Sequence, residues 1–518
     1  MNGSAPAGQF ADRRTVMIVL PGLLLAILLA MLDNLIVGTA LPRIVGTLGG
    51  VAHLSWVVTA YILASTITTP FYGKLGDMYG RKKFFIAAII IFLVGSALSG
   101  LSHSMAQLIT FRALQGLGAG GLMVSAMATL GDLVSPRERG KYMSYMMVVM
   151  MLATIGGPLV GGVITTDFSW RWIFYINLPV GGAALVYLMA VLHVSENRVQ
   201  HKVDYLGGTL LAVAATAIIL LATWGGTEYG WGSVQIIGLA LLAVATTAGF
   251  CSTEMRAPEP ILPLHVFKNR NFTVAITLTF LTGVAMFGAM TFLPLYQQTV
   301  QGASPTVSGL MLTPMMIGVT ITSILAGQVT TRTGKYKMFP ILGGGLMGVG
   351  MYLLTNLTVH TTRFTSGVYY VVLGLGMGFT MQMVSLIAQN SVGQKDMGVA
   401  SSARMFFQQI GGSLGVAAFG AVFARRLTES LASNASHGVH VDAAGGQLDP
   451  ATVDSLPPVV RDDVFVAIAH ATQGVFYWAL PCSVLLFLLA WLVKEVPLRG
   501  RTPSAPTQES STPEAVHL

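Results

Sequence analysis

Fourteen separate runs of mostly apolar residues divide this sequence, and each is about as long as a membrane-spanning helix. Such a helix needs about 20 apolar residues, and inside lipid only helices and closed barrels satisfy every backbone polar group. The 518 residues are 53% hydrophobic and only 10% charged, whereas a soluble domain carries about 25% charged residues. We therefore predict an all-α integral membrane protein. The predicted spans are 17–41, 53–72, 84–102, 106–130, 142–164, 172–192, 204–224, 234–251, 272–296, 307–330, 338–357, 366–388, 400–424 and 470–493.

Basic residues are distributed unevenly between the loops that join these spans. An even number of spans places both termini on one side of the membrane. That side would carry 21 Lys and Arg residues and the other side 6, with two more inside spans. Because basic loops stay on the cytoplasmic side, we expect both termini in the cytoplasm of a bacterium, with the chain in its cytoplasmic membrane. The net charge of +8 reflects these loops and does not indicate a nucleic-acid partner.

An internal repeat relates the two halves of the chain at an offset of about 254 residues. Two six-span halves in the same orientation predict two helical bundles around a central cavity, which rock to give alternating access. Spans seven and eight lie between the halves as an inserted pair. The matching segments are Gly73–Lys83 with Gly327–Lys337, then Gly116, Gly118 and Gly120 with Gly374, Gly376 and Gly378, and Gly156-Gly157 with Gly411-Gly412.

The repeat and the spans together predict the domain organisation. The last long outer loop is polar, and the C-terminal tail is rich in Pro, Ser and Thr, a composition typical of disorder. The predicted parts are a cytoplasmic tail at 1–16, a six-helix bundle at 17–192, the inserted pair at 204–251, a second six-helix bundle at 272–493 with an outer loop at about 425–469, and a disordered cytoplasmic tail at 494–518.

Four motifs, in order and each in the expected span or loop, carry a resemblance to a known family. The chain resembles the major facilitator superfamily, and it is most similar to the fourteen-span drug:proton antiporters. The resemblance covers nearly the whole chain and implies an exporter driven by the proton gradient, without a cofactor. Met78 stands where the family usually has Arg. The motifs are L-D-N-L-I-V-G-T-A-L-P at 32–42, G-K-L-G-D-M-Y-G-R-K-K at 73–83, R-A-L-Q-G-L-G-A-G at 112–120 and the exporter motif G-P-L-V-G-G at 157–162.

Asp33 is the only acidic residue that lies deep within a predicted span. A carboxylate at that depth must face protein or water and usually marks a proton or ion pathway. Burial favours its protonated form and an approaching cation favours its ionised form, so proton and cation could compete for it. The alternative is a structural Asp whose hydrogen bonds are made by neighbouring helices.

Arg112 is the candidate partner of Asp33, and the resemblance implies that Arg112 and Gln115 take part in proton transfer. Arg112 could instead be a fixed charge bonded to helix-end carbonyls.

The loop between the second and third spans contains the candidate gating residues Gly73, Asp77, Gly80 and Arg81. Asp77 can cap a helix and pair with Arg81, so its contacts could hold one access state and break in the other. The alternative is that these charges only set orientation.

Gly157, Pro158, Gly161 and Gly162 in the fifth span predict close helix packing. In exporters this surface would seal the interface between the bundles. These residues are not predicted to bind substrate.

Polar, Met and aromatic residues in spans that line the predicted cavity are candidates for substrate binding. For each of them the alternative is ordinary packing within the membrane. Arg404 could meet an anionic group or extend to the inner surface. The candidates are Asn34, Trp56, Tyr61, Phe287, Met290, Gln382, Gln389, Arg404, Phe407 and Gln408.

We predict a proton-coupled antiporter that exports small amphipathic or cationic compounds, as in multidrug or antibiotic efflux, with Asp33 as the coupling carboxylate. The expected partners are the bilayer, the substrate and protons, and we expect a monomer with no metal. A dedicated exporter of an endogenous metabolite, antibiotic or lipid-like molecule remains an alternative. The sequence disfavours an enzyme, since it lacks clustered catalytic residues, and it has no Walker motif for ATP-driven transport. A non-transporting receptor is disfavoured by the intact Asp33 and Arg112.

Overall fold

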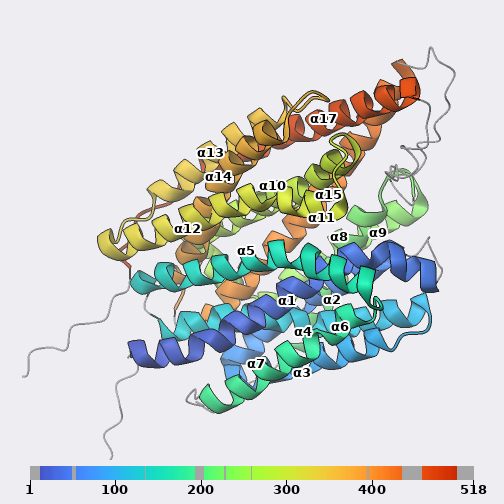
Figure 1. Ribbon diagram of the computed structural model, residues 1–518. Helices are drawn as coiled ribbons and strands as arrows, with labels where there is room; N and C mark the ends of the chain where they lie inside the picture. Colours follow the sequence, from blue (N-terminus) through green and yellow to red (C-terminus); the bar gives the residue numbers. More distant parts are fainter. Residues whose placement is uncertain are drawn as a thin grey trace, which may run out of the picture.

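The computed structural model describes residues 12–48, 54–134, 136–192, 204–226, 229–257, 260–393, 396–433 and 458–498. In these ranges the regular elements are helices (Figure 1), and the β-structure is one isolated bridge between Gly225 and Tyr229. Three segments with sequence-based expectations lie outside the described residues. They are the N-terminal residues 1–11, the middle of the last outer loop at 434–457, and the C-terminal residues 499–518.

The helices form two groups of six spans, with an inserted pair between them in sequence (Figure 1). Each group packs mainly within itself. The first group comprises α1 (Arg13–Leu48), α2 (Leu54–Tyr79), α3 (Arg81–Gly100), α4 (Met105–Leu133), α5 (Pro136–Asp167) and the sixth span, divided into α6 (Trp172–Tyr175) and α7 (Asn177–Val191). The inserted pair is α8 (Tyr205–Trp224) and α9 (Val234–Glu254), followed by the 3-10 helix η2 (Leu264–Lys268). The second group comprises α10 (Arg270–Thr299), a span divided into α11 (Pro305–Met311) and α12 (Thr313–Thr333), α13 (Met338–Leu354), α14 (Arg363–Asn390), α15 (Met397–Ser433) and α17 (Pro458–Ala490).

The predicted all-α membrane fold is confirmed. Within the described residues, 12 helices are long and apolar enough to cross a membrane. Helix α13 is shorter, and α2, which carries Lys74 and Asp77, is not among the 12. Helix α15 continues to Ser433 and α17 begins at Pro458, so both helices extend into the predicted outer loop at about 425–469.

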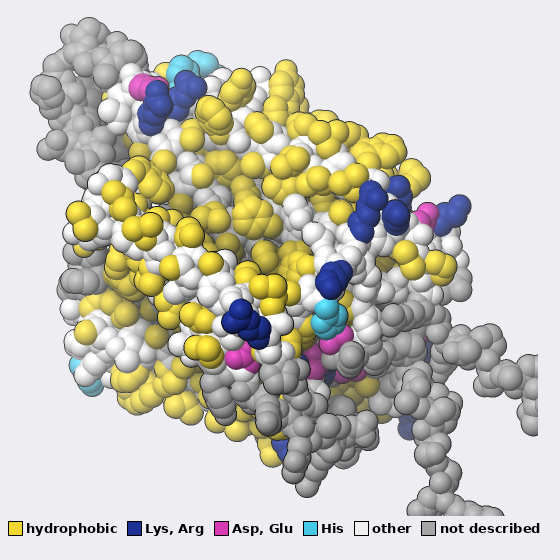
Figure 2. Space-filling model, turned by 180° about the vertical axis from the view of Figure 1, so that it is seen from behind, with side chains coloured by type: hydrophobic (Ala, Val, Ile, Leu, Met, Phe, Trp, Pro, Cys, Tyr) yellow, Lys and Arg dark blue, Asp and Glu magenta, His cyan; other side chains and the backbone are white. Residues whose placement is uncertain are grey.

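Apolar side chains cover wide areas of the surface. Figure 2 shows hydrophobic side chains over most of the face in view, with Lys and Arg in separate clusters. On α9, Leu241 and Val244 are 66% and 70% exposed. Large contiguous apolar surfaces are rare on monomeric soluble proteins, so this surface is suited to lipid.

The repeated glycines let the fourth span of each group, α4 and α14, pack against its neighbouring helices in the same way. A Cβ atom at Gly116 of α4 would lie 2.4 Å from the carbonyl oxygen of Tyr61 in α2, and one at Gly374 of α14 would lie 2.0 Å from that of Met315 in α12. Only glycine permits such close approach of two backbones. The sequence repeat therefore corresponds to a repeated packing arrangement, in which α4 lies between α2 and α3 and α14 lies between α12 and α13.

The two groups meet along two seams. At the first seam α5 packs against α12, and Ser144 Oγ donates a hydrogen bond to the Ser323 carbonyl at 3.3 Å. At the second seam α2 packs against α15, with Thr66 Oγ1 donating to Gln409 Oε1. Helix α8 packs on both α2 and α15. The inserted pair therefore covers the second seam.

Candidate functional site

Asp33 of α1 lies at the centre of a buried polar network inside the first group of helices. Its Oδ2 accepts from Arg112 Nη1 at 2.7 Å, which forms an ion pair, and its Oδ1 accepts from Gln115 Nε2 at 2.8 Å. Asn177 Nδ2 donates to the same Oδ1 at 2.7 Å. Asp33, Arg112 and Gln115 are all 0% exposed. The structure thus brings together the three residues predicted for proton coupling and adds a fourth.

Three helices supply these four side chains. Arg112 and Gln115 lie on one face of α4, because residues three apart in a helix are neighbours, and Arg112 Nη1 also donates to Gln115 Oε1 at 2.8 Å. Asn177 is the first residue of α7, directly after the break that follows α6. Its Nδ2 also lies 3.0 Å from Ser96 Oγ of α3. The network therefore connects α1, α3, α4 and α7.

The guanidinium of Arg112 is also held by α2. Its carbon lies 4.1 Å from the centre of the Tyr61 ring, and its Nε donates to the Val57 carbonyl at 3.4 Å. Its Nη2 has no hydrogen-bond partner among the described residues. An aromatic face stabilises a buried cation. Tyr61, predicted to line the substrate cavity, instead packs against the ion pair.

Sequence reasoning did not identify Asn177. The only signal was a polar amide inside the predicted span 172–192. The pattern of the chain does not indicate that this amide lies within hydrogen-bond distance of Asp33.

A second charged cluster lies where α2 and α3 meet. Arg81 pairs with Asp77 at 2.5 Å and with Asp132 of α4, and Gly80 between the two helices has φ of 99°. This φ is readily adopted only by glycine, which explains Gly80. The predicted Asp77–Arg81 pair is present, whereas the pairing with Asp132 was not predicted.

The same cluster reaches across to the second group of helices. Val399, in the first turn of α15, donates its backbone N–H to Asp77 Oδ2 at 3.1 Å. A Cβ at Gly73 would lie 2.7 Å from the Gly398 carbonyl oxygen, and one at Gly398 would lie 2.5 Å from the Asp77 carboxylate. A carboxylate at a helix N-terminus is favoured by the helix dipole. Asp77 therefore links α2 of the first group to α15 of the second group.

Replacing Asp77 by Asn should loosen this contact without unfolding the chain, because Arg81 keeps Asp132. A hydrogen bond to a charged group contributes about 1.5–3 kcal/mol, so the population with α2 and α15 apart at this end should rise about tenfold or more. The measurement is the rate of thiol labelling at Ser402→Cys, which is buried beside Gly73. Lys82→Gln in the same segment is the control. Equal labelling rates in Asp77→Asn and wild type would contradict a gating role.

The exporter motif packs within the first group of helices where it can be described. A Cβ at Gly157 would lie 2.6 Å from Leu35 Cβ of α1, and Gly161 accepts a hydrogen bond from Thr165 at 2.7 Å. The described contact of Gly157 is thus within one bundle and not across the expected inter-bundle interface. The side-chain surroundings of Pro158 and Gly162 lie outside the described part of the chain.

The substrate-cavity candidates are not gathered in one place. Trp56 packs on Trp224 of α8, with ring centres 5.6 Å apart. Phe407 packs on Phe267 of η2 at 6.1 Å. Tyr61 packs on Arg112 in the first group, and the side chain of Asn34 is outside the described part. The remaining candidates lie within the second group: Phe287 packs beside Gly412, Met290 is partly buried in the core, Gln382 is buried, Gln389 Nε2 lies 3.2 Å from Ser401 Oγ, and Arg404 Nη1 donates to Gln408 Oε1 at 3.0 Å.

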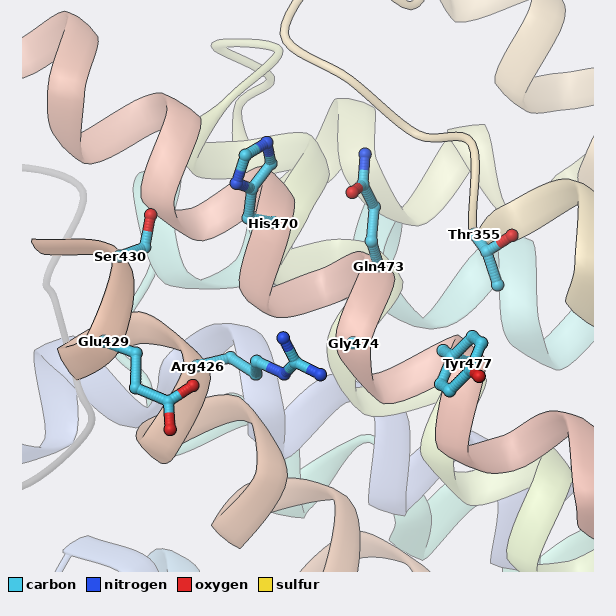
Figure 3. Close-up of a pocket in the computed structure, with 8 residues that line it drawn as sticks. All are labelled: Thr355, Arg426, Glu429, Ser430, His470, Gln473, Gly474 and Tyr477. Carbon is cyan, nitrogen blue, oxygen red and sulfur yellow. The ribbon is translucent and has the colours of Figure 1, made fainter. Parts of the chain in front are cut away.

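An open pocket lies on the second group, between α13, α15 and α17 (Figure 3). Its volume is about 510 Å³. It contains none of the predicted cavity residues and does not lie between the two bundles. It is lined by Thr355, Arg426, Glu429, Ser430, His470, Gln473, Gly474 and Tyr477.

Two bundles of six membrane helices, a buried acid–arginine pair in one of them and a charged contact between them define a polytopic membrane transporter. The chain belongs to the Major Facilitator Superfamily, whose family model matches residues 23–416. It is therefore a transporter and not an enzyme.

The chain is similar to two curated transporters of Bacillus subtilis. It is 40% identical to multidrug transporter protein MdtP, over 81% of this chain and 78% of that protein. It is 36% identical to multidrug resistance protein 3, over 91% and 93%. The crystal structure of the human organic anion transporter MFSD10 (TETRAN) has the same fold, with a TM-score of 0.60 and 14% identity, covering 93% of this chain and 100% of that one.

Proposed function

We propose that this transporter exports small amphipathic compounds, cations among them, in exchange for protons. The observation that carries the proposal is the fully buried ion pair of Asp33 and Arg112, with both carboxylate oxygens bonded. An ionisable pair at bilayer depth is expensive to maintain and typically serves ion or proton movement. The multidrug names of the two Bacillus relatives support export as the direction.

A proton on Asp33 would act through the helices that meet there. Protonation removes the charge that balances Arg112, and an unpaired buried charge is strongly unfavourable. Since α1, α3, α4 and α7 all contribute to the network, its release changes how these helices pack. Asp33 is 0% exposed, so direct competition between a substrate cation and a proton for this carboxylate does not fit this conformation. We infer that coupling is indirect.

We further propose that the α2–α3 end faces the bacterial cytoplasm, as the basic loops indicate, and that the chain acts as a monomer. The contact of Asp77 with Val399 closes this end. The conformation described is then closed toward the cytoplasm. Release of the contact would open the path for a cytoplasmic substrate.

Purified transporter in liposomes tests the function directly. With ethidium as the probe and one proton exchanged for one monovalent cation, no net charge moves. A gradient of one pH unit should therefore support about a tenfold ethidium gradient, and an imposed voltage should add nothing. Protein-free liposomes are the control. Ethidium accumulation that persists after a protonophore has collapsed the pH gradient would argue against proton exchange.

A further inference from the structure

The described residues include three buried arginines, and one of them differs from the other two. Arg81, Arg112 and Arg404 are 6%, 0% and 7% exposed. The first two form ion pairs with carboxylates. Among the described residues, Arg404 forms no ion pair, and its hydrogen bond there is from Nη1 to the neutral Gln408 at 3.0 Å.

Within the described part of the chain, no carboxylate forms an ion pair with Arg404. This includes Asp204, which caps α8, and Asp396, which directly precedes α15 and lies 3.8 Å from His265 Nε2. Helices α8, α10 and α14 contain no Asp or Glu. The one acid of α2 and the one acid of α4, Asp77 and Asp132, pair with Arg81. Helix α17 carries its two acids in its first turns, near the far end of α15. In α15 itself, Glu429 lies about 37 Å further along the helix axis.

Arginine stays protonated in proteins, so Arg404 cannot become neutral to avoid being a buried charge without a partner. A buried charge without a partner costs several kcal/mol, so an anion from outside the chain would stabilise this site. Two contacts beside this pair involve apolar side chains: Gln408 Nε2 lies 4.0 Å from Met286 Sδ of α10, and Phe407 packs against Phe267. A guanidinium and an amide beside an apolar wall suit an amphipathic molecule with a carboxylate, sulfonate or phosphate group.

We propose that Arg404, together with Gln408, binds the anionic group of an amphipathic substrate. This inference rests on the proposed export function and extends its substrate class to organic anions. It assigns the two halves different tasks: the first bundle holds the proton site at Asp33, and the second holds the charged end of the substrate.

A matched pair of fluorescent probes isolates the charge. Anilinonaphthalene sulfonate and N-phenyl-1-naphthylamine share one aromatic skeleton, and only the first carries a sulfonate. Binding of both is measured by probe fluorescence with the full chain in phosphatidylcholine nanodiscs, where no anionic lipid competes, and empty nanodiscs are subtracted. The wild type should bind the sulfonate more tightly. Arg404→Gln should weaken sulfonate binding about tenfold or more and leave the neutral probe unchanged.

Two further variants complete the test. Arg404→Lys should retain part of the preference for the sulfonate, and Arg425→Gln, an exposed arginine on the same helix, should retain all of it. Any of three results would overturn the proposal. The wild type could bind both probes equally, Arg404→Gln could keep the wild-type preference for the sulfonate, or Arg404→Gln could lower the affinity for both probes by the same factor. Because binding needs no proton gradient, failure of proton exchange in the ethidium experiment is a separate result.

Discussion

Asp33→Asn should lose pH-gradient-driven export, with a fall of about 100-fold or more in the initial rate. Asparagine resembles the protonated acid in shape and charge, so the network of Asp33 with Arg112 and Asn177 would stay in its protonated arrangement. A proton site that cannot alternate cannot couple the gradient to transport. In an antiporter the substrate is carried while the proton site is deprotonated, so exchange of labelled for unlabelled substrate should fall as well.

The measurement compares pH-gradient-driven transport with substrate exchange in inverted vesicles. Asp462→Asn, which removes an exposed acid from α17, is the matched control and should transport normally. Full, gradient-dependent export by Asp33→Asn would remove the basis of the proposed coupling.

The second large effect concerns the stability of the folded protein. Replacing Asp33 and replacing Arg112 should lower this stability by different amounts. In Arg112→Gln the carboxyl of Asp33 can take up a proton and become neutral. In Asp33→Asn the guanidinium of Arg112 stays charged, and the described neighbours that remain are uncharged: Gln115, Val57 and the rings of Tyr61 and Phe174. Breaking a buried pair from one side costs about 3–5 kcal/mol. We therefore expect a loss of about that size for Asp33→Asn and a smaller loss for Arg112→Gln.

The double variant Asp33→Asn/Arg112→Gln should recover most of the lost stability, because no unpaired charge remains. Thermal unfolding in detergent, followed by tryptophan fluorescence, gives the three values needed for the interaction energy. The double variant should be folded and still uncoupled from the proton gradient. Additive losses in the two single variants would show that the pair contributes nothing as a pair.

The sequence predicts the helices and the central ion pair well, for a physical reason. Apolar runs of membrane length allow few folds, and charges at bilayer depth are so rare that Asp33 and Arg112 could be expected to meet. The internal repeat predicted two similar bundles, and the repeated glycines Gly116 and Gly374 pack in the same way in the two groups of helices.

Contacts that depend on how the helices are positioned relative to one another could not be predicted from the sequence. Asn177 bonds Asp33 from the start of α7, and Asp132 bonds Arg81 from the end of α4. Tyr61 and Trp56 looked like cavity residues by type, yet one covers Arg112 and the other packs on α8. Residue type indicates that a side chain can bind a substrate, but not which surface it faces.

Helix α8 packs on α2 and α15 together, and this has a consequence for compounds dissolved in the bilayer. Amphipathic molecules concentrate in lipid, so a sideways entrance between the bundles would be useful to an exporter. On the side where α2 packs against α15, the inserted pair of helices would block the entry of such a molecule. Any sideways entrance is left to the opposite flank, between α5 and α12, which gives this arrangement of helices one preferred side for entry from the bilayer.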